Sequence, residues 1–143
     1  MPNRGGRFNK EADLSMAWDA LYRAAKQVLK PRKISEWMDA GGVAAAIESY
    51  SGTIYTGVCV DGACALGICA ERNAIFQMIT NGESEIRRVI AVNWSGKVIP
   101  PCGACRELMA QLMPKIYQHI EIMLNYETRE TALLGALTPK WWI

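Results

Sequence analysis

Three cysteines and one glutamate are the residues of this sequence best suited to act together in chemistry. Cys69 and Glu71 belong to the stretch CAER, and Cys102 and Cys105 form a CxxC within PCGACRE. Thiolate sulfur is a preferred zinc ligand, and a catalytic zinc ion takes three protein ligands and keeps a fourth position open for water. The two stretches therefore predict a metal centre that can react with a substrate.

The CxxC has other interpretations when it is taken alone. A thioredoxin-type redox pair also places CxxC beside a strand and a helix, and a structural zinc site uses CxxC as half of a four-cysteine set. The remaining cysteines, Cys59 and Cys64, form no second CxxC with Cys69. Buried structural cysteines beside an incidental surface glutamate are a further alternative. The complete combination, C-A-E followed by P-C-G-x-C, favours the catalytic zinc site over each of these.

Glu71 completes this prediction because it follows the ligand Cys69 without being a ligand itself. Zinc lowers the pKa of its bound water, and a carboxylate beside the metal can take a proton from that water and pass it to a leaving nitrogen. Zinc-dependent nucleobase deaminases carry this arrangement, with a glutamate close to the first ligand and a later P-C-x-x-C. We therefore predict Glu71 as the proton shuttle.

Length and composition favour a single domain. The 143 residues can bury one core, and we expect a flexible tail over 1–12 and one domain over 13–143. No apolar run is long enough for a membrane span, and no secretory signal is present at the N-terminus. A reducing cytoplasmic location is therefore the default expectation, and there an odd cysteine number, five, makes a disulfide framework unfavoured. A net charge of +2 with few grouped basic residues makes a polynucleotide substrate an unfavoured alternative.

The predicted metal ligands would be positioned at the starts of helices, and the hydrophobic pattern predicts a helix start at each of the two stretches. Helices are predicted over 14–30, from 68 or 69 to 80, and from 102 to 113, and strands over 43–47, 54–60, 87–94 and 119–126. The last residues, from 131, are predicted as a short strand or helical turn with a tail. This order indicates a three-layer α/β/α sandwich around a mixed sheet of about five strands.

Over roughly residues 14–142 the chain resembles the small zinc-dependent cytidine deaminases of the homotetrameric, three-cysteine type. The resemblance lies in the VAAAI and IYTG strands, in GICAERNAI and PPCGACREL, and more weakly in LTPKWW. It implies that cytidine or deoxycytidine is hydrolysed at C4 by hydroxide on one zinc ion per chain, with release of ammonia. Cys69, Cys102 and Cys105 would bind the zinc, Glu71 would move the protons, and the backbone at Ala70 and Pro100 would hold the base.

Arg72 follows Glu71 directly and has a predicted electrostatic role. Zinc with three thiolates and one hydroxide carries a formal charge of about −2. An arginine that hydrogen-bonds a ligand sulfur offsets part of this charge, which is the role that the resemblance implies for Arg72. A solvent-exposed helix arginine is the alternative.

The sequence departs from the family where the sugar would be held. Cys59 and Asp61 stand where an Asn and a Glu are usual, and Gly41 stands where an aromatic residue is expected, a space that Trp37 could fill. Since a pocket that loses hydroxyl partners changes its specificity, a modified cytosine nucleoside such as blasticidin S is an alternative substrate. The resemblance also implies that a terminal aromatic residue, Trp142 or Trp141, reaches the active site of a neighbouring subunit.

Overall fold

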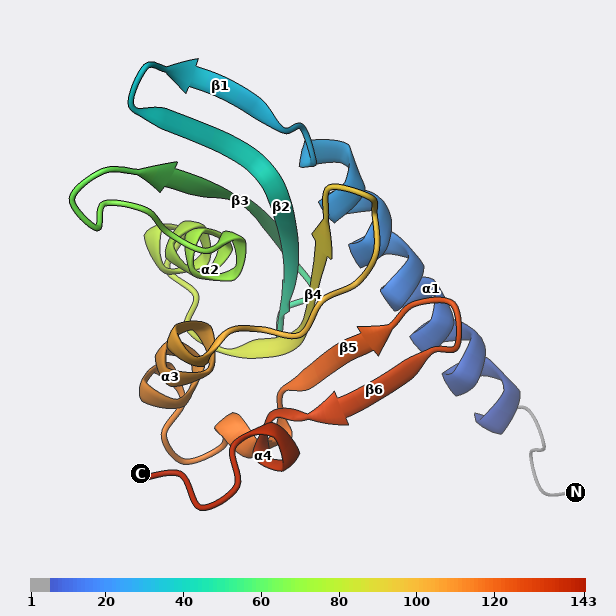
Figure 1. The fold of residues 1–143 in the computed structure, drawn as a ribbon. Helices are drawn as coiled ribbons and strands as arrows, with labels where there is room; N and C mark the ends of the chain where they lie inside the picture. Colours follow the sequence, from blue (N-terminus) through green and yellow to red (C-terminus); the bar gives the residue numbers. More distant parts are fainter. Residues whose placement is uncertain (1–5) are drawn as a thin grey trace, which may run out of the picture.

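A mixed six-stranded sheet carries helices on both faces in the computed structural model, which describes residues 6–143 (Figure 1). The strands are β1 (Arg32–Ser35), β2 (Met38–Ser49), β3 (Ile54–Gly62), β4 (Ile86–Asn93), β5 (Glu121–Asn125) and β6 (Glu130–Leu133). The helices are α1 (Gly6–Val28), α2 (Ala70–Thr80), α3 (Gly103–Leu112) and α4 (Leu134–Leu137), and a 3-10 turn spans Tyr117–His119. The predicted α/β fold is confirmed. No helix in residues 6–143 combines the length and apolarity that a membrane crossing requires.

The long strand β2 is the centre of the sheet. One edge of β2 pairs antiparallel with β3, and the other edge pairs with β1 near its start and with β4 from Val43 onward. β4 pairs parallel with β5, and β6 closes the sheet antiparallel to β5. A parallel pair needs a crossover connection, and the segment with α3 provides it (Figure 1).

Alternation along β2 explains why helices cover both faces. Ala44 and Ala46 belong to the core beneath α1, which also contains Trp18. Ile47 points to the other face, in the core that contains residues of α2 and α3. Because successive strand residues face opposite sides of a sheet, the small side chains of this run let helices approach both faces closely.

The start of the first helix was predicted wrongly. Residues 6–12, assigned above to the flexible tail over 1–12, belong to α1, which begins before the predicted start at residue 14. No proline lies between Gly6 and Asp13, so the backbone can remain helical through this stretch. The first five residues of the predicted tail lie outside the described residues.

The sheet has six strands where about five were predicted, and β1 is a strand that the sequence analysis missed. All four of its residues are exposed, so it carries no alternating apolar pattern that could signal a strand. It is held by pairing with the start of β2, as in the Arg32–Ala40 pair.

Candidate active site

The N-termini of α2 and α3 bring the three predicted ligands together. Cys69 is the N-cap of α2 and Cys102 is the N-cap of α3, and both have extended backbone conformations. Cys105 lies in the first turn of α3 and is buried. Exposed N–H groups at a helix start favour negative charge, so both helices direct their positive ends at a cluster of potential thiolates.

The sulfur positions fit a zinc ion. Cys69 Sγ lies 3.3 Å from Cys102 Sγ, which lies 3.4 Å from Cys105 Sγ, and all three atoms lie within 4.8 Å of one another. These separations exceed the roughly 2.05 Å of a disulfide. Two thiolates on one tetrahedral zinc stand about 3.8 Å apart when each Zn–S bond is about 2.3 Å. The three cysteines can therefore hold a zinc ion, which confirms the predicted cofactor site.

Close packing against the sheet fixes the start of α2. A Cβ added to Gly57 on β3 would lie only 2.4 Å from the backbone nitrogen of Ala74 and 2.6 Å from the carbonyl oxygen of Ala70. Only glycine allows this approach. The side chain of Asn73 also donates a hydrogen bond of 3.1 Å to the carbonyl of Val58. β3 therefore sets the position of the helix turn that carries Cys69 and Glu71.

The loop before α3 is held from two sides. Ile99 N–H donates a 3.0 Å hydrogen bond to the carbonyl of Ala91 on β4. Arg106 donates through Nε to the carbonyl of Pro101 at 2.8 Å and through Nη1 to the carbonyl of Leu137 at 2.9 Å. Arg106 thus links the loop that carries Cys102 to the end of α4, a contact that the sequence analysis did not predict.

Glu71 lies beside the sulfur cluster and is almost fully buried, with 4% of its surface exposed. Its Oε2 lies 3.6 Å from Cys105 Sγ. Burial raises the pKa of the Glu71 carboxyl because it penalises the charged form. A carboxyl in this position is suited to act as a general acid and base on a group bound beside the sulfur cluster.

The two cysteines of α3 differ in acidity. Burial is the largest influence on Cys102 and acts to raise its pKa, but hydrogen bonds from the backbone at Cys105 and Ala104 and from neighbouring thiols bring a net lowering. Burial and the nearby Glu71 carboxylate raise the pKa of Cys105. Cys105 therefore depends most on a bound cation to ionise, since a metal deprotonates the thiols that coordinate it.

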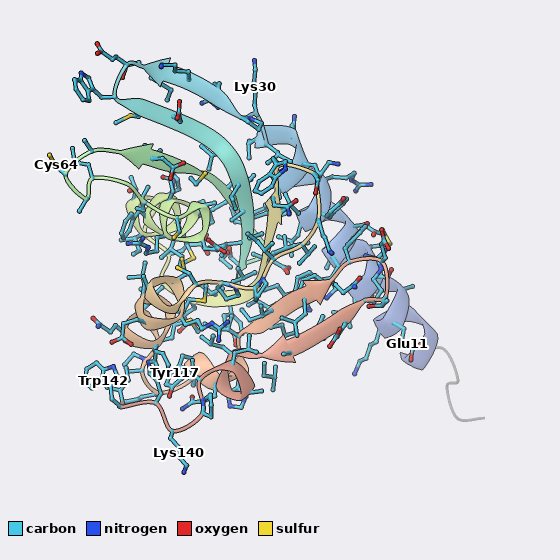
Figure 2. The ribbon with its side chains drawn as sticks, viewed as in Figure 1. Glu11, Lys30, Cys64, Tyr117, Lys140 and Trp142 are labelled. Atoms are coloured by element: carbon cyan, nitrogen blue, oxygen red, sulfur yellow. The ribbon has the colours of Figure 1, made fainter. Side chains whose placement is uncertain are left out.

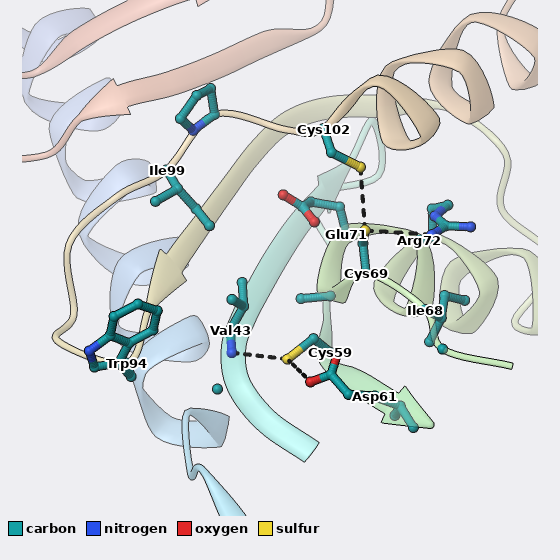
Figure 3. Close-up of a pocket in the computed structure, with 15 residues that line it drawn as sticks. Val43, Cys59, Asp61, Ile68, Cys69, Glu71, Arg72, Trp94, Ile99 and Cys102 are labelled. Atoms are coloured by element: carbon teal, nitrogen blue, oxygen red, sulfur yellow. Dashed lines mark hydrogen bonds between the residues drawn. The ribbon is translucent and has the colours of Figure 1, made fainter. Parts of the chain in front are cut away.

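Arg72 contacts the cluster as predicted. Its Nη2 donates to Cys69 Sγ at 3.5 Å (Figure 3). The hydrogen bond to Cys69 is the main cause that raises the pKa of the Arg72 guanidinium, with a smaller contribution from Cys105. The side chain therefore supplies positive charge to the thiolate cluster, which contradicts the alternative of a purely solvent-exposed arginine.

A pocket of about 490 Å³ opens beside the cluster (Figure 3). This volume lies within the range of small-molecule sites. The pocket is lined by predicted site residues from both its metal and its substrate ends: Cys59, Asp61, Cys69, Ala70, Glu71, Arg72, Pro100 and Cys102. It is also lined by Trp94, which the sequence analysis missed because the residue follows β4 outside any recognisable motif.

The tryptophans that were predicted near the substrate lie elsewhere in this chain. Trp37 is at the turn between β1 and β2 and is not among the residues that line this pocket. Trp142 is 70% exposed and donates through Nε1 to Glu107 on α3 at 2.7 Å. Figure 2 shows it at the C-terminal end of the fold, near Tyr117. Within one chain, therefore, Trp142 does not enter the pocket.

Comparison with known proteins supports a zinc-binding site in this part of the chain. Residues 19–120 match the family model of the cytidine and deoxycytidylate deaminase zinc-binding region. A cytidine deaminase from Halalkalibacterium halodurans is 39% identical over 51 residues, which are 34% of this chain and 39% of that protein. The aligned part of this chain thus spans well under half the length of that relative.

Solved structures match a larger part of the chain. The cytidine deaminase from Mycobacterium leprae is 27% identical, with a TM-score of 0.69 over 86% of this chain and 98% of that one. The cytidine deaminase from Burkholderia pseudomallei is 29% identical, with a TM-score of 0.67 over 85% and 96% of the two chains. Because the family model matches most of the chain, and three cysteine sulfurs that could hold a metal lie beside a buried glutamate, the chain belongs to the cytidine and deoxycytidylate deaminase zinc-binding family.

Proposed function

We propose that this protein is a zinc-dependent hydrolase that converts cytidine or deoxycytidine to the uracil nucleoside and ammonia. The observation that carries the proposal is the buried Glu71 carboxylate beside the three cysteine sulfurs, on the wall of a ligand-sized pocket. The matched relatives are cytidine deaminases. For this reason cytidine, and not blasticidin S, is the substrate proposed.

Glu71 would move the protons of the reaction. Cys69, Cys102 and Cys105 would hold the zinc ion, which would supply Lewis acidity that makes water a nucleophile near neutral pH. As the water oxygen forms a bond to C4 of the ring, Glu71 takes a proton from it and gives that proton to N3. Glu71 then takes the second proton and gives it to the amine, so the C4–N bond breaks and ammonia leaves.

The backbone around the pocket would hold the base. Ala70 is at the first position of α2, so its N–H is one of the helix-start donors that have no partner within the helix. Pro100 lies on the opposite strand-to-helix loop and also lines the pocket. A donor and a carbonyl acceptor on two sides of the pocket suit the carbonyl and amino groups of a cytosine edge.

The charges of the pocket support a nucleoside over a nucleotide. Among the described residues that line it, Arg72 is the single cation, and it already contacts Cys69. The outer part carries the carboxylate of Asp61 and the thiol of Cys59. Because a phosphate is held by cations or by several N–H donors, a deoxycytidylate would meet repulsion from Asp61 instead. Cys59 and Asp61 are proposed to face the sugar hydroxyls.

The proposal includes a homotetramer in which Trp142 enters a neighbouring subunit. Its indole is exposed at the end of the chain, where a second copy could cover it. A reducing compartment such as the cytoplasm is proposed because the ligands must remain free thiols, as all five cysteines are in this structure.

Replacement of Glu71 by glutamine tests the proposed function. Glu71→Gln keeps the side-chain volume but cannot accept a proton, so ammonia release from cytidine should fall by roughly a thousandfold or more. Metal analysis should still find zinc at the wild-type stoichiometry. Glu130→Gln, at an exposed site on β6, is the matched control and should keep wild-type activity. Full turnover by Glu71→Gln, or no ammonia release by the wild-type protein, would contradict the proposal.

A further inference from the structure

An exposed tryptophan forms one wall at the outer end of the pocket, which is the end lined by Cys59 and Asp61. Trp94 is 73% exposed, yet it lines the same pocket as Glu71 and Asp61. Figure 3 shows its indole on the side opposite Cys59 and Asp61, with Val43 between them. An aromatic ring in this position offers a large, rigid contact surface to a ligand at low cost in conformational entropy.

The turn that carries Trp94 is fixed by its own hydrogen bonds. The side-chain oxygen of Asn93 accepts from the N–H of Ser95 at 3.0 Å and from the N–H of Lys97 at 3.1 Å. Gly96 takes a φ of +78°, and its N–H donates to the carbonyl of Asn93 at 2.8 Å. The Trp94 backbone is therefore positioned before any ligand arrives, which lowers the cost of binding.

A contact with α1 fixes the same turn from outside. Tyr22 donates its hydroxyl to the carbonyl of Gly96 at 2.9 Å. The Tyr22 ring is stacked on Tyr126, with centroids 3.8 Å apart. The turn is thus tied to the helix layer on the far side of the sheet from α2.

The strand pairing sets the width of the outer pocket. Asn93, next to Trp94, pairs with Val43 on β2, and the N–H of Val43 donates to Cys59 Sγ on β3 at 3.2 Å. Two strand spacings separate β4 from β3, which is about 10 Å. Gly42 forms part of the floor between them and leaves it without a side chain. Side chains that rise from β3 and from the end of β4 are thus far enough apart to contact a sugar ring from two sides.

The distance from Ala91 on β4 to Trp94 indicates which part of a substrate would contact Trp94. Ala70, beside Glu71, packs with Ala45 and Ala91 beneath the metal end of the pocket. Trp94 follows Ala91 by three residues, so it lies roughly 10 Å further along. A cytosine ring with its C4 at Glu71 would occupy the metal end. The substituent on N1 of the ring would then enter the gap between Trp94 and Asp61.

We propose that Trp94 is a specificity-determining residue that packs against the sugar of a pyrimidine nucleoside, while Asp61 accepts hydrogen bonds from its hydroxyls on the opposite side. The inference rests on the proposed function, since it takes the base to be placed with C4 at Glu71. It assigns the recognition of the sugar to an indole face and a carboxylate, and it predicts discrimination between a nucleoside and its free base.

Binding of uridine and of uracil to the zinc-loaded full chain tests this inference. Ligand-observed NMR titration measures both dissociation constants, even in the millimolar range, and requires no turnover. Trp94→Ala should weaken uridine binding about tenfold, the effect of losing one aromatic contact, and should change uracil binding less than twofold. Trp94→Phe keeps a ring in place and should stay within about threefold of the wild type for both ligands.

Trp37→Ala is the matched control, because Trp37 is also 73% exposed but lies outside the pocket. It should leave both dissociation constants unchanged. The inference is overturned if Trp94→Ala weakens both ligands equally, if it weakens neither, or if the wild-type protein binds uracil as tightly as uridine. Ammonia release from cytidine, measured separately on the wild-type protein, decides the proposed function. The two failures are therefore distinguishable.

Discussion

The two ends of the pocket are built in different ways. At the metal end, Glu71 and Cys105 are buried, and the three sulfurs, the carboxylate and the Arg72 guanidinium contact one another directly. At the outer end, Trp94 and Asp61 are exposed, and they lie in the turn after β4 and on β3. Here the hydrogen bonds hold the backbone, as in the turn after β4, where the N–H of Lys97 donates to the side-chain oxygen of Asn93.

This difference indicates that the metal end carries out the reaction and that the outer end recognises the substrate. Buried groups in contact depend on one another, so a change to one alters the charge or geometry of the rest. Exposed groups on separate segments can be replaced one at a time with little effect on folding. The metal end should therefore respond to substitution by losing the metal or the reaction, and the outer end by changing substrate affinity.

Replacement of two pocket cysteines gives the largest contrast. Cys102→Ser removes a proposed zinc ligand and should lower both bound zinc and cytidine turnover by roughly a hundredfold or more, exceeding the effect expected of residues that only orient ligands. Cys59→Ser alters a thiol in the same pocket and should keep zinc at the wild-type level. Metal analysis with an ammonia assay measures both. Equal zinc loss in the two variants would show that the ends are not separate.

Arg72 provides the second contrast, because it acts on the metal end through a ligand. Arg72→Gln removes the positive charge beside Cys69 and should lower turnover by about 10- to 100-fold. Arg72→Lys keeps the charge without the planar donor group and should recover part of this loss.

The control for Arg72 is Arg87→Gln on β4, since Arg87 lies over the Tyr50 ring, 5.1 Å from its centroid, and outside the pocket. It should leave turnover unchanged. A similar loss in Arg87→Gln would mean that the effect comes from net charge and not from the contact with Cys69.

The same division explains what could be predicted from sequence. The metal end was predictable because Cys69, Glu71 and Arg72 are neighbours on one helix turn, and Cys102 and Cys105 on another. Helix geometry and ligand chemistry therefore suffice once two helix starts are identified. The continuous apolar run VAAAI over 43–47 likewise predicted a buried strand.

The outer end could not be predicted in this way. Trp94 and Cys59 line the same pocket only because β4 pairs with β2 and β2 pairs with β3. Such pairing depends on tertiary register, which no local pattern around an isolated tryptophan reveals. The missed strand β1 has the same cause, because its four exposed residues depend on β2 for their conformation.

Asp61 tests the outer end with a smaller expected effect. Asp61→Asn keeps the shape but loses a charged acceptor, so the KM for cytidine should rise about three- to tenfold while kcat stays within twofold. Steady-state kinetics measure both. Asp39→Asn is a close control because Asp39 is the cross-strand partner of Asp61 but does not line the pocket. A fall in kcat with Asp61→Asn would instead connect this carboxylate to the chemical step.

The smallest expected effect comes from replacing Tyr22, which does not line the pocket but hydrogen-bonds the turn that carries Trp94. Tyr22→Phe keeps the ring stacked on Tyr126 but loses the hydrogen bond to the carbonyl of Gly96. The free energy of unfolding should fall by about 1 kcal/mol, and uridine binding should weaken about twofold because Trp94 is held less firmly. Tyr126→Phe loses its hydroxyl contact with Asp19 instead. It should lower stability by a similar amount but leave uridine binding unchanged, so a twofold loss of binding in both variants would mean that stability, and not the position of Trp94, sets the affinity.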